Sequence, residues 1–272
     1  MEHFRAKCLG RGLDVWHEFP TSLYNEHIAE RGLTASLRNL SIGRGVLVGN
    51  TKVAWPHFLA WFRQTRKDHQ DPFDTWCREV IEESVLEDQP LGVLEDQPLG
   101  ILEDQPLGIY YSHEVGERLV SMARVASCSG LCVLDDATHL AIHPEYGSWI
   151  SFRAVIVFPG SFDEGTLPTR RRERLENPLS GDRLLRVKAL VDAATVASTC
   201  STSHADVEKN SALWISIRDS VCTEEQLARH RFPDEMVAYH YCGDKSLLGG
   251  ARLTEGEGGE EGGGGGGRRG PD

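Results

Sequence analysis

The sequence has no run of apolar residues long enough to cross a membrane and no secretory leader. A membrane-spanning helix needs about 20 predominantly apolar residues, and no apolar run of this chain approaches that length. Residues 1–12 mix charged side chains with a few apolar ones, so they lack the apolar centre of a signal peptide. We therefore expect a soluble, cytoplasmic protein.

Positive charge is also scarce. The chain has 29 Lys and Arg against 41 Asp and Glu, which gives a formal net charge of −12. Nucleic acids and anionic membranes bind surfaces rich in Lys and Arg, because the release of counterions favours such contacts. The composition argues against both partners, and an anionic ligand would need a local group of cations.

The common catalytic motifs are missing as well. The sequence contains no GxxxxGK[ST] loop, no GxGxxG leading into a helix and no GxSxG turn. The short stretch Gly43-Arg44-Gly45 is too brief to surround a phosphate. Nucleotide-binding and serine hydrolase functions therefore have no motif to support them.

The cysteines are scattered, and their number is odd. We expect them to be reduced, because the chain carries no export signal. Cys128 and Cys132 are four residues apart and could form half of a metal site or a redox pair. No second Cys or His pair stands at zinc-site spacing, so we interpret both as small buried residues. The seven cysteines are Cys8, Cys77, Cys128, Cys132, Cys200, Cys222 and Cys242.

Two segments are not expected to form part of the folded core. Residues 254–272 are mostly Glu and Gly, and we expect a disordered tail because such a segment cannot bury enough apolar surface to order itself. Between Val85 and Gly108 the unit VLEDQPLG occurs three times, the last beginning with Ile. Its Pro-Leu-Gly interrupts helices and central strands, so we interpret residues 85–108 as an inserted surface loop, with a functional acidic arm as the alternative. Residues 1–253 are then expected to form one domain.

The remaining sequence alternates between the two regular periodicities. Helical spacing predicts helices over residues 53–66, 116–130, 184–196 and 233–241, and short apolar or alternating runs predict strands over 46–48, 109–115 and 149–158. In the last strand Phe152, Ala154 and Ile156 are expected on one face. The fold class predicted is α+β, with an antiparallel-leaning sheet flanked by helices.

Two isolated arginines stand in apolar surroundings on predicted regular elements. Arg183 and Arg218 each need a carboxylate, either on the neighbouring Asp182 and Asp219 or on a ligand. A denser group of arginines between two prolines is interpreted instead as a solvated loop. Its members are Arg170, Arg171, Arg172 and Arg174.

The segment IHPEYGSWISFRAVIVFPG, residues 142–160, is the most distinctive in the chain. A His-Pro turn, an aromatic residue, a Gly-Ser pair and a Trp precede a long strand. Such a turn either forms a rigid platform for a flat ligand or simply packs its Trp. The segment resembles the CblC family, the methylmalonic aciduria and homocystinuria type C proteins, which carry an Ile-His-Pro-aromatic-Gly-Gly-Trp turn before a strand ending in Leu-Pro-Gly.

Further segments resemble the same family in the same order. They are CLGRGLDV, LYNE, GVLVGNTKVAWPHFLAWFRQ, WISIRD and the stretch from Arg231 to Tyr239. The resemblance therefore covers residues 8–248 and leaves the octapeptide repeats unmatched.

The resemblance implies a nitroreductase-like flavoprotein fold that holds cobalamin with its lower base detached. It implies reductive decyanation of cyanocobalamin, with FMN or FAD as the flavin and NADPH as the electron source, and glutathione-dependent dealkylation of alkylcobalamins. It also implies a CblD-like trafficking partner and either a monomer or a cofactor-dependent homodimer. The alternatives are a non-catalytic corrinoid chaperone and a plain flavin reductase on the same fold.

The family's binding residues can be carried over to this chain by position. No catalytic side chain is implied, and cobalt enters only with cobalamin. The glutathione site falls on Arg218, on Arg183 and near Lys245, where a Lys keeps the charge but not the guanidinium fork. Ser148 replaces the second glycine of the turn, and the family's Tyr-rich loop after Gly130 is shortened. The short loop predicts that the upper face of the cobalt is more open, so that glutathione is oxidised in a futile reaction. The expected cobalamin-binding residues are Thr138, His139, His143, Trp149, Ile150, Ser151 and Phe152.

Overall fold

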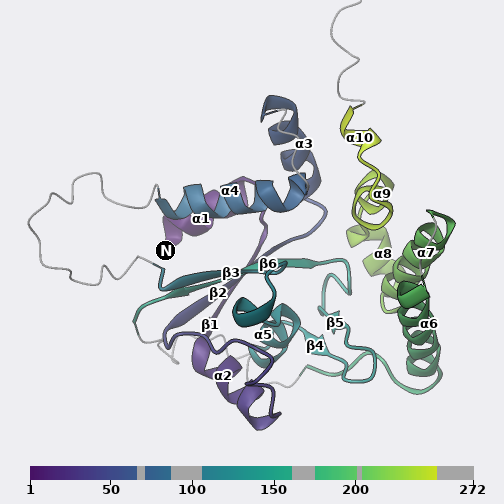
Figure 1. The fold of residues 1–272 in the computed structure, drawn as a ribbon, viewed down its shortest axis with the longest axis horizontal. Helices are drawn as coiled ribbons and strands as arrows, with labels where there is room; N and C mark the ends of the chain where they lie inside the picture. Colours follow the sequence, from purple (N-terminus) through teal and green to yellow (C-terminus); the bar gives the residue numbers. More distant parts are fainter. Residues whose placement is uncertain (66–70, 87–105, 161–174, 201–203, 250–272) are drawn as a thin grey trace, which may run out of the picture.

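A four-stranded antiparallel sheet forms the centre of the computed structural model (Figure 1). The structure describes residues 1–65, 71–86, 106–160, 175–200 and 204–249. The strand order is β1-β2-β6-β3, and β4 pairs with β5 in a separate two-stranded sheet. The strands are β1 (Val15–Pro20), β2 (Arg44–Asn50), β3 (Gly108–Tyr111), β4 (Val133–Leu134), β5 (Ala141–Ile142) and β6 (Ser151–Phe158).

Helices cover both faces of the sheet. One face carries α1 (Glu2–Gly10), α3 (Ala54–Thr65) and α4 (Pro72–Leu86), and the other carries α2 (Thr21–Glu30) and α5 (Met122–Cys128) (Figure 1). A further group of helices stands at one end of the sheet (Figure 1). Its members are α6 (Gly181–Cys200), α7 (His204–Ser220), α8 (Glu224–His230), α9 (Asp234–Cys242) and α10 (Ser246–Gly249).

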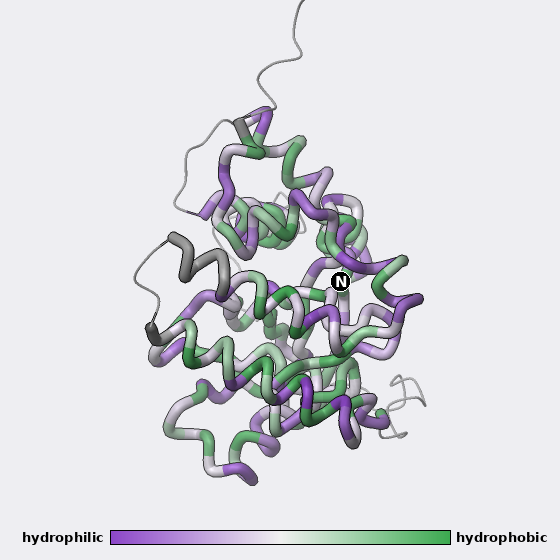
Figure 2. The backbone as a smooth tube through the Cα atoms, turned by 90° about the vertical axis from the view of Figure 1, so that its right-hand side faces the viewer, coloured by the Kyte–Doolittle hydropathy of each residue, from purple (hydrophilic) through white to green (hydrophobic). Residues whose placement is uncertain are grey.

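Each face of the sheet has its own core. Val46, Val48 and Ile156 belong to the core beneath α1, α3 and α4, whereas Leu47 and Val155 belong to the core beneath α2 and α5. This alternation follows from the two-residue period of a strand. In Figure 2 hydrophobic segments run through the middle of the molecule, and hydrophilic segments are frequent toward its outside.

A β-bulge changes the alternation in β6. Val48 pairs with Ala154 but Gly49 pairs with Phe152, so Arg153 has no Cα partner on β2. The extra residue turns Phe152 toward the α2 and α5 core, while Ala154 faces the opposite core. The expectation that these two side chains share a face is therefore wrong. A Cβ on Gly49 would lie 2.3 Å from the carbonyl oxygen of Ser151, so the bulge requires glycine there.

The predicted α+β class with an antiparallel sheet is confirmed, but two predicted elements are shorter than expected. Strand β3 ends at Tyr111, and the helix predicted over residues 116–130 is broken. Residues 116–118 form a 3-10 turn, and the link to α5 is extended. It is held there because Arg38 N donates to Leu119 O, and Ser121 N donates to the Tyr24 hydroxyl.

The described cysteines other than Cys200 are free thiols. Cys128 ends α5 and Cys132 follows the turn at Gly130, so the two do not share a helix face, although both pack in the α2 and α5 core. The tail, the arginine group and most of the repeats (residues 250–272, 161–174 and 87–105) lie outside the described residues. Among the helices that are described, none is long and apolar enough to cross a membrane.

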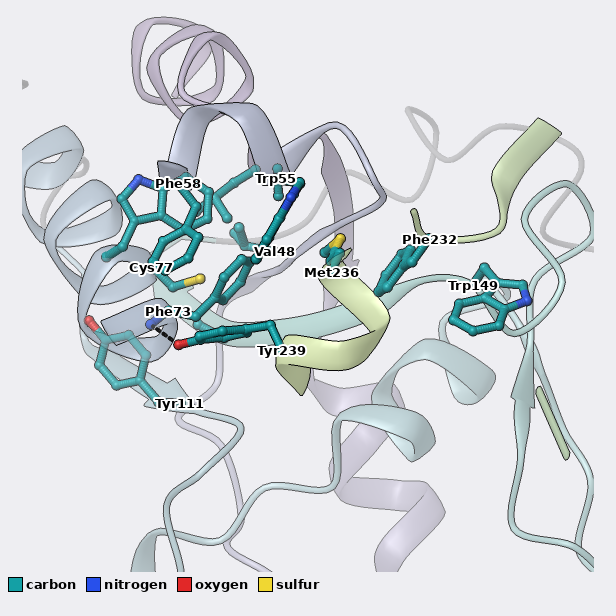
Figure 3. Packing of buried hydrophobic residues seen from close by; sticks show 14 of the residues in the cluster. Val48, Trp55, Phe58, Phe73, Cys77, Tyr111, Trp149, Phe232, Met236 and Tyr239 are labelled. Atoms are coloured by element: carbon teal, nitrogen blue, oxygen red, sulfur yellow. Dashed lines mark hydrogen bonds between the residues drawn. The ribbon is translucent and has the colours of Figure 1, made fainter. Parts of the chain in front are cut away.

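An aromatic cluster joins α9 to α3 and α4. Phe58 is fully buried, and its ring lies 4.9 Å from that of Phe73 and 5.5 Å from that of Tyr239. The Tyr239 hydroxyl accepts a hydrogen bond from Phe73 N, drawn as the dashed line in Figure 3. Helix α9 thus reaches the helical layer over the sheet.

We predict that Phe58→Ala lowers the free energy of unfolding by about 3–5 kcal/mol, because it leaves a cavity between three helices. Phe62 on the same helix is only half-buried, so Phe62→Ala is the matched control and should cost less than about 2 kcal/mol. Urea denaturation measures both. Equal losses of unfolding free energy in the two variants would contradict the prediction that Phe58 is the central residue of the aromatic cluster.

Candidate functional site

The His-Pro turn before β6 is held by its own hydrogen bonds. His143 and Gly147 exchange two backbone bonds of 2.8 and 2.9 Å. The His143 Nδ1 atom accepts from the backbone N–H groups of Glu145 and Tyr146 at 3.1 and 3.2 Å, and its ring stacks on Tyr146 with centroids 4.6 Å apart. The left-handed φ of +59° at Gly147 completes the turn. The sequence predicted a rigid turn, and the structure has one.

Burial, together with the nearby imidazoles of His17 and His230, lowers the pKa of His143 to about 4. The ring is therefore neutral near pH 7. Because Nδ1 accepts two hydrogen bonds, the proton of the neutral ring belongs on Nε2. The site thus contains a neutral imidazole fixed in one tautomer.

The turn rests on the junction of α7 and α8. A Cβ on Gly147 would lie 2.3 Å from Cys222 Sγ, so only glycine fits at this position. The Ser148 hydroxyl donates to Arg218 O at 2.8 Å, and Gln226 Nε2 donates to Pro144 O at 2.9 Å. Ser148 therefore adds a hydrogen bond to α7 that a glycine would lack.

Trp149 lies between two arginines. Its ring is fully buried, and the guanidinium carbons of Arg218 and Arg231 lie 5.0 and 5.3 Å from it. Its Nε1 donates to Asp219 Oδ1 at 3.1 Å, and Asp219 also pairs with Arg231 at 3.3 Å. Figure 3 shows Trp149 beside Phe232, with ring centroids 5.3 Å apart. Asp219, the sequence neighbour considered as a partner for Arg218, pairs with Arg231 instead.

Arg218 connects three elements. Its Nη1 donates to the Tyr241 hydroxyl of α9 at 2.7 Å, and its Nη2 donates to Ile150 O, just before β6, at 2.8 Å. The aromatic faces of Trp149, Phe232 and Tyr241 surround the guanidinium. Within the described part of the chain, no carboxylate forms an ion pair with Arg218. The partners described for its guanidinium are all neutral groups.

The other two predicted glutathione ligands have different surroundings. Arg183 Nε donates to Ser220 O at 3.1 Å, and its Nη2 donates to Cys222 O at 3.0 Å. Arg183 thereby binds carbonyls at the C-terminal end of α7, a stabilising role for a cation. Lys245 is exposed in the link between α9 and α10. Of the three, Arg218 alone contacts the turn and β6 by a described hydrogen bond.

Thr138 and His139 lie in the link from β4 to β5, upstream of the turn. The Thr138 backbone N–H and hydroxyl donate to Asp135 Oδ1 at 2.8 and 2.7 Å, and Asn177 Nδ2 donates to Asp135 Oδ2 at 2.7 Å. Burial raises the pKa of Asp135, but these hydrogen bonds outweigh burial and lower it overall. His139 is exposed with a φ of +58°. The described contacts hold Thr138 to this link and not to the turn.

The sequence did not single out Arg153 and His240. The bulge in β6 places Arg153 against Asn50 Oδ1 at 2.7 Å and Asp74 Oδ1 at 3.3 Å. Burial, with Arg153 and Arg218 nearby, lowers the pKa of His240 to about 3. His240 therefore stays neutral, and it lies near both cations. The signal for Arg153 was hidden because a bulge cannot be read from an alternating pattern.

Arg153 on β6 is paired with Asp74, whereas Arg218 forms no ion pair with a described carboxylate. An arginine in this state suits a ligand with a carboxylate or phosphate. Among the residues described, no group of three or more His, Cys, Asp or Glu is placed to hold a metal ion.

No family model matches the sequence, and no curated protein does. A solved structure does match: the Caenorhabditis elegans protein described as a B12-trafficking protein CblC and a human MMACHC homologue. The match covers 91% of this chain and 94% of that chain, with a TM-score of 0.59 and 14% sequence identity. The chain has the CblC fold. The resemblance found in the sequence is thus confirmed for the fold.

The neutral state of His143 makes a testable prediction about acid stability. Because its pKa is lower in the folded chain than the usual 6.5, the unfolded chain binds the proton first as pH falls. His143 therefore stabilises the fold fully above about pH 6.5, and this contribution is lost as pH falls toward 4. His143→Asn keeps an acceptor near Nδ1 but does not titrate. We expect the loss of unfolding free energy between about pH 7 and about pH 4.5 to be smaller in this variant by about 1–3 kcal/mol.

Urea denaturation at the two pH values measures the difference. His240 contributes a slope of the same sign in both proteins, so the comparison isolates His143. His139→Asn is the matched control, because His139 is exposed and its left-handed backbone suits Asn. If His143→Asn lost as much unfolding free energy between the two pH values as the unchanged chain, the lowered pKa of His143 would be contradicted.

Proposed function

We propose that this chain is a cobalamin-processing protein of the CblC family, which binds cobalamin with its lower base detached and removes its upper ligand. The observation that best supports the proposal is the fold, which 91% of the chain shares with a B12-trafficking protein. A fold alone does not determine a function. The proposal therefore also draws on the turn before β6 and on Arg218.

The residues before and within β6 have two different roles in this proposal. Trp149 and Ile150 are 0% and 4% exposed, so they shape the site from beneath. His143, Ser151 and Phe152 keep exposed surface and are proposed to contact the corrin. Because the turn is fixed by its own hydrogen bonds, binding a flat ligand on it costs little ordering of the chain.

Detachment of the lower base removes a donor ligand from cobalt, which makes cobalt easier to reduce. In dealkylation, the thiolate of glutathione attacks the cobalt-bound carbon. A sulfur–carbon bond forms, the cobalt–carbon bond breaks, and its electron pair stays on cobalt, which passes from Co(III) to Co(I). The thiol proton is released to solvent before the attack. The protein orients the thiolate and excludes water.

Arg218 is proposed to bind a carboxylate of glutathione. Its present acceptors are neutral, and a carboxylate would form a stronger, charge-assisted hydrogen bond. The cation also favours the thiolate over the thiol if the sulfur lies nearby. Arg183 and Lys245 remain part of the proposed glutathione site only by their position in the family pattern.

Reductive decyanation is proposed as the second activity. Reduced FMN or FAD, with NADPH as the electron source, would supply the electron for this reduction, and the cyanide of the substrate would be released as the anion. Among the residues that the structure describes, we identify no cradle for a flavin phosphate, so we derive no step through the flavin. Transfer of the processed cobalamin to a CblD-like protein completes the proposal.

A second candidate is a non-catalytic corrinoid chaperone. It is favoured by the capping role of Arg183, which leaves Arg218 as the single well-placed anchor for glutathione. A plain flavin reductase on the same fold is the third possibility.

The first experiment is a visible absorption titration of the purified chain with methylcobalamin, followed by anaerobic glutathione. A shift to the base-off spectrum and then decay to cob(I)alamin are the expected results. A base-off shift without decay would support the chaperone. No shift would remove cobalamin from the proposal and favour the flavin reductase.

The role of Arg218 can be tested against that of Arg183. Arg218→Lys keeps the charge but loses the guanidinium fork, so we expect the KM for glutathione in dealkylation to rise about tenfold. The Kd for cobalamin should change by less than about threefold, because the corrin contacts are made by the turn.

Arg183→Lys is the matched control. It should lower the melting temperature by weakening the cap of α7, with the KM for glutathione unchanged. If both variants raise this KM alike, or if Arg218→Lys weakens cobalamin binding as much as dealkylation, the assignment of Arg218 is wrong.

A further inference from the structure

Strand β3 lies at an edge of the central sheet. Within the described part of the chain it pairs with β6 on one side and with no strand on the other. In an antiparallel pair, successive residues direct their backbone groups alternately toward the partner strand and away from it. Ser112 N donates to Arg153 O of β6 at 2.9 Å. Ile109 and Tyr111 therefore direct their backbone groups away from β6, to the free edge.

The turn that follows β3 binds these outward groups. Glu114 Oε2 accepts from Tyr111 N at 3.0 Å, and Glu114 N donates to Tyr111 O at 3.1 Å. Arg118 Nη2 donates to Ile109 O at 2.5 Å. Gly116, with a φ of +66°, turns the chain so that Arg118 returns to the strand that it follows. Glu114 and Arg118 thus cap the edge of β3.

The two capping side chains also hold each other. Arg118 Nε donates to Glu114 Oε1 at 2.8 Å, and the guanidinium carbon of Arg118 lies 5.2 Å from the centroid of the Tyr110 ring. The Glu114 side chain is 18% exposed, but that of Arg118 is 55% exposed. Exposed ion pairs contribute little to stability, so the cap can open while the rest of the fold stays intact.

The chemistry of β3 restricts what could pair with the open edge. Ile109 and Tyr111 pack in the core beneath α1, α3 and α4, whereas Tyr110 packs in the core beneath α2 and α5. A strand that extends the sheet here would extend both layers, so it should be apolar on both of its faces. Strand β3 itself has this character.

A second copy of β3 also fits the edge by symmetry. An antiparallel pair centred on Tyr110 would place Ile109 of one chain opposite Tyr111 of the other. Both copies would then use the same surface, and such a contact closes after two chains. Leu107, which is 45% exposed just before β3, would gain a neighbouring strand.

We propose that the edge of β3 is an interaction surface for a second copy of this chain, and that Glu114 and Arg118 keep it closed. Unpaired edge strands are templates for association, and charged side chains are one means by which proteins block them. In the capped chain this edge stays unpaired. No residue of the proposed cobalamin and glutathione sites takes part, so this proposal does not depend on the proposed function.

Sedimentation velocity of the full chain, without cobalamin, flavin or glutathione, tests the proposal. The double variant Glu114→Ala/Arg118→Ala frees Ile109 O and Tyr111 N, and we expect its association constant for dimerisation to rise about tenfold over that of the unchanged chain.

Glu225→Ala/Arg229→Ala is the matched control. It removes an ion pair with the same i,i+4 order of Glu and Arg, but this pair lies exposed on α8, away from the sheet edge. We expect its association constant to stay within about twofold of that of the unchanged chain.

Hydrogen–deuterium exchange locates the contact. In the dimer of the double variant, the amides of residues 108–111 should exchange more slowly than in its monomer. Thermal unfolding checks that the variants are folded, and Arg118→Ala alone, which frees Ile109 O, is the second variant if the double variant unfolds. A control pair that dimerises as strongly, an association constant that does not rise, or a dimer without slower exchange at residues 108–111 would overturn the proposal.

Discussion

Arg218 lies between the start of β6 and helix α9, and it joins the central sheet to the C-terminal helices. Its guanidinium binds Ile150 O and the Tyr241 hydroxyl, and its own backbone carbonyl accepts from Ser148. Arg218 is half-buried, and removing a cation from water even partly without a carboxylate has a cost that aromatic faces and neutral acceptors offset only in part. The same arrangement that joins the sheet to the C-terminal helices therefore leaves a site that favours an anionic ligand.

This local charge matters because the protein is acidic as a whole. A formal charge of −12 repels anions at long range, and salt screens that repulsion beyond about 8–10 Å. Beside the turn, Arg218 forms no ion pair with a described carboxylate, and burial keeps His143 and His240 neutral. Short-range contacts with Arg218, and not the charge of the whole chain, would therefore decide whether an anion binds there.

The sequence predicted the parts of this arrangement that depend on local pattern. The rigid turn before β6 could be foreseen because His-Pro and Gly147 define a turn whatever surrounds it. The bulge could not, since FRAVIVF is apolar apart from Arg153 and carries no sign of a register shift, whereas in the structure Gly49 lies close to Ser151 and Arg153 has no Cα partner on β2. Likewise, Arg183 stands among apolar residues in the sequence, yet the end of another helix supplies its partners. Tertiary contacts of this kind leave no signal in a single sequence.

In the proposed function, whether the chain acts as an enzyme or as a carrier depends on which groups can bind Arg218. A glutathione carboxylate can replace the Tyr241 hydroxyl or Ile150 O, because a charge-assisted bond is stronger than either neutral one. Glutathione has a second carboxylate, and the nearest alternative cation, Arg231, is already paired with Asp219 and Asp234. One anchor fixes the position of a peptide but leaves its rotation free, so the thiolate would meet the cobalt-bound carbon less often than with two anchors. In the proposed function, this single anchor predicts weaker binding of glutathione and slower dealkylation than three free arginines would give.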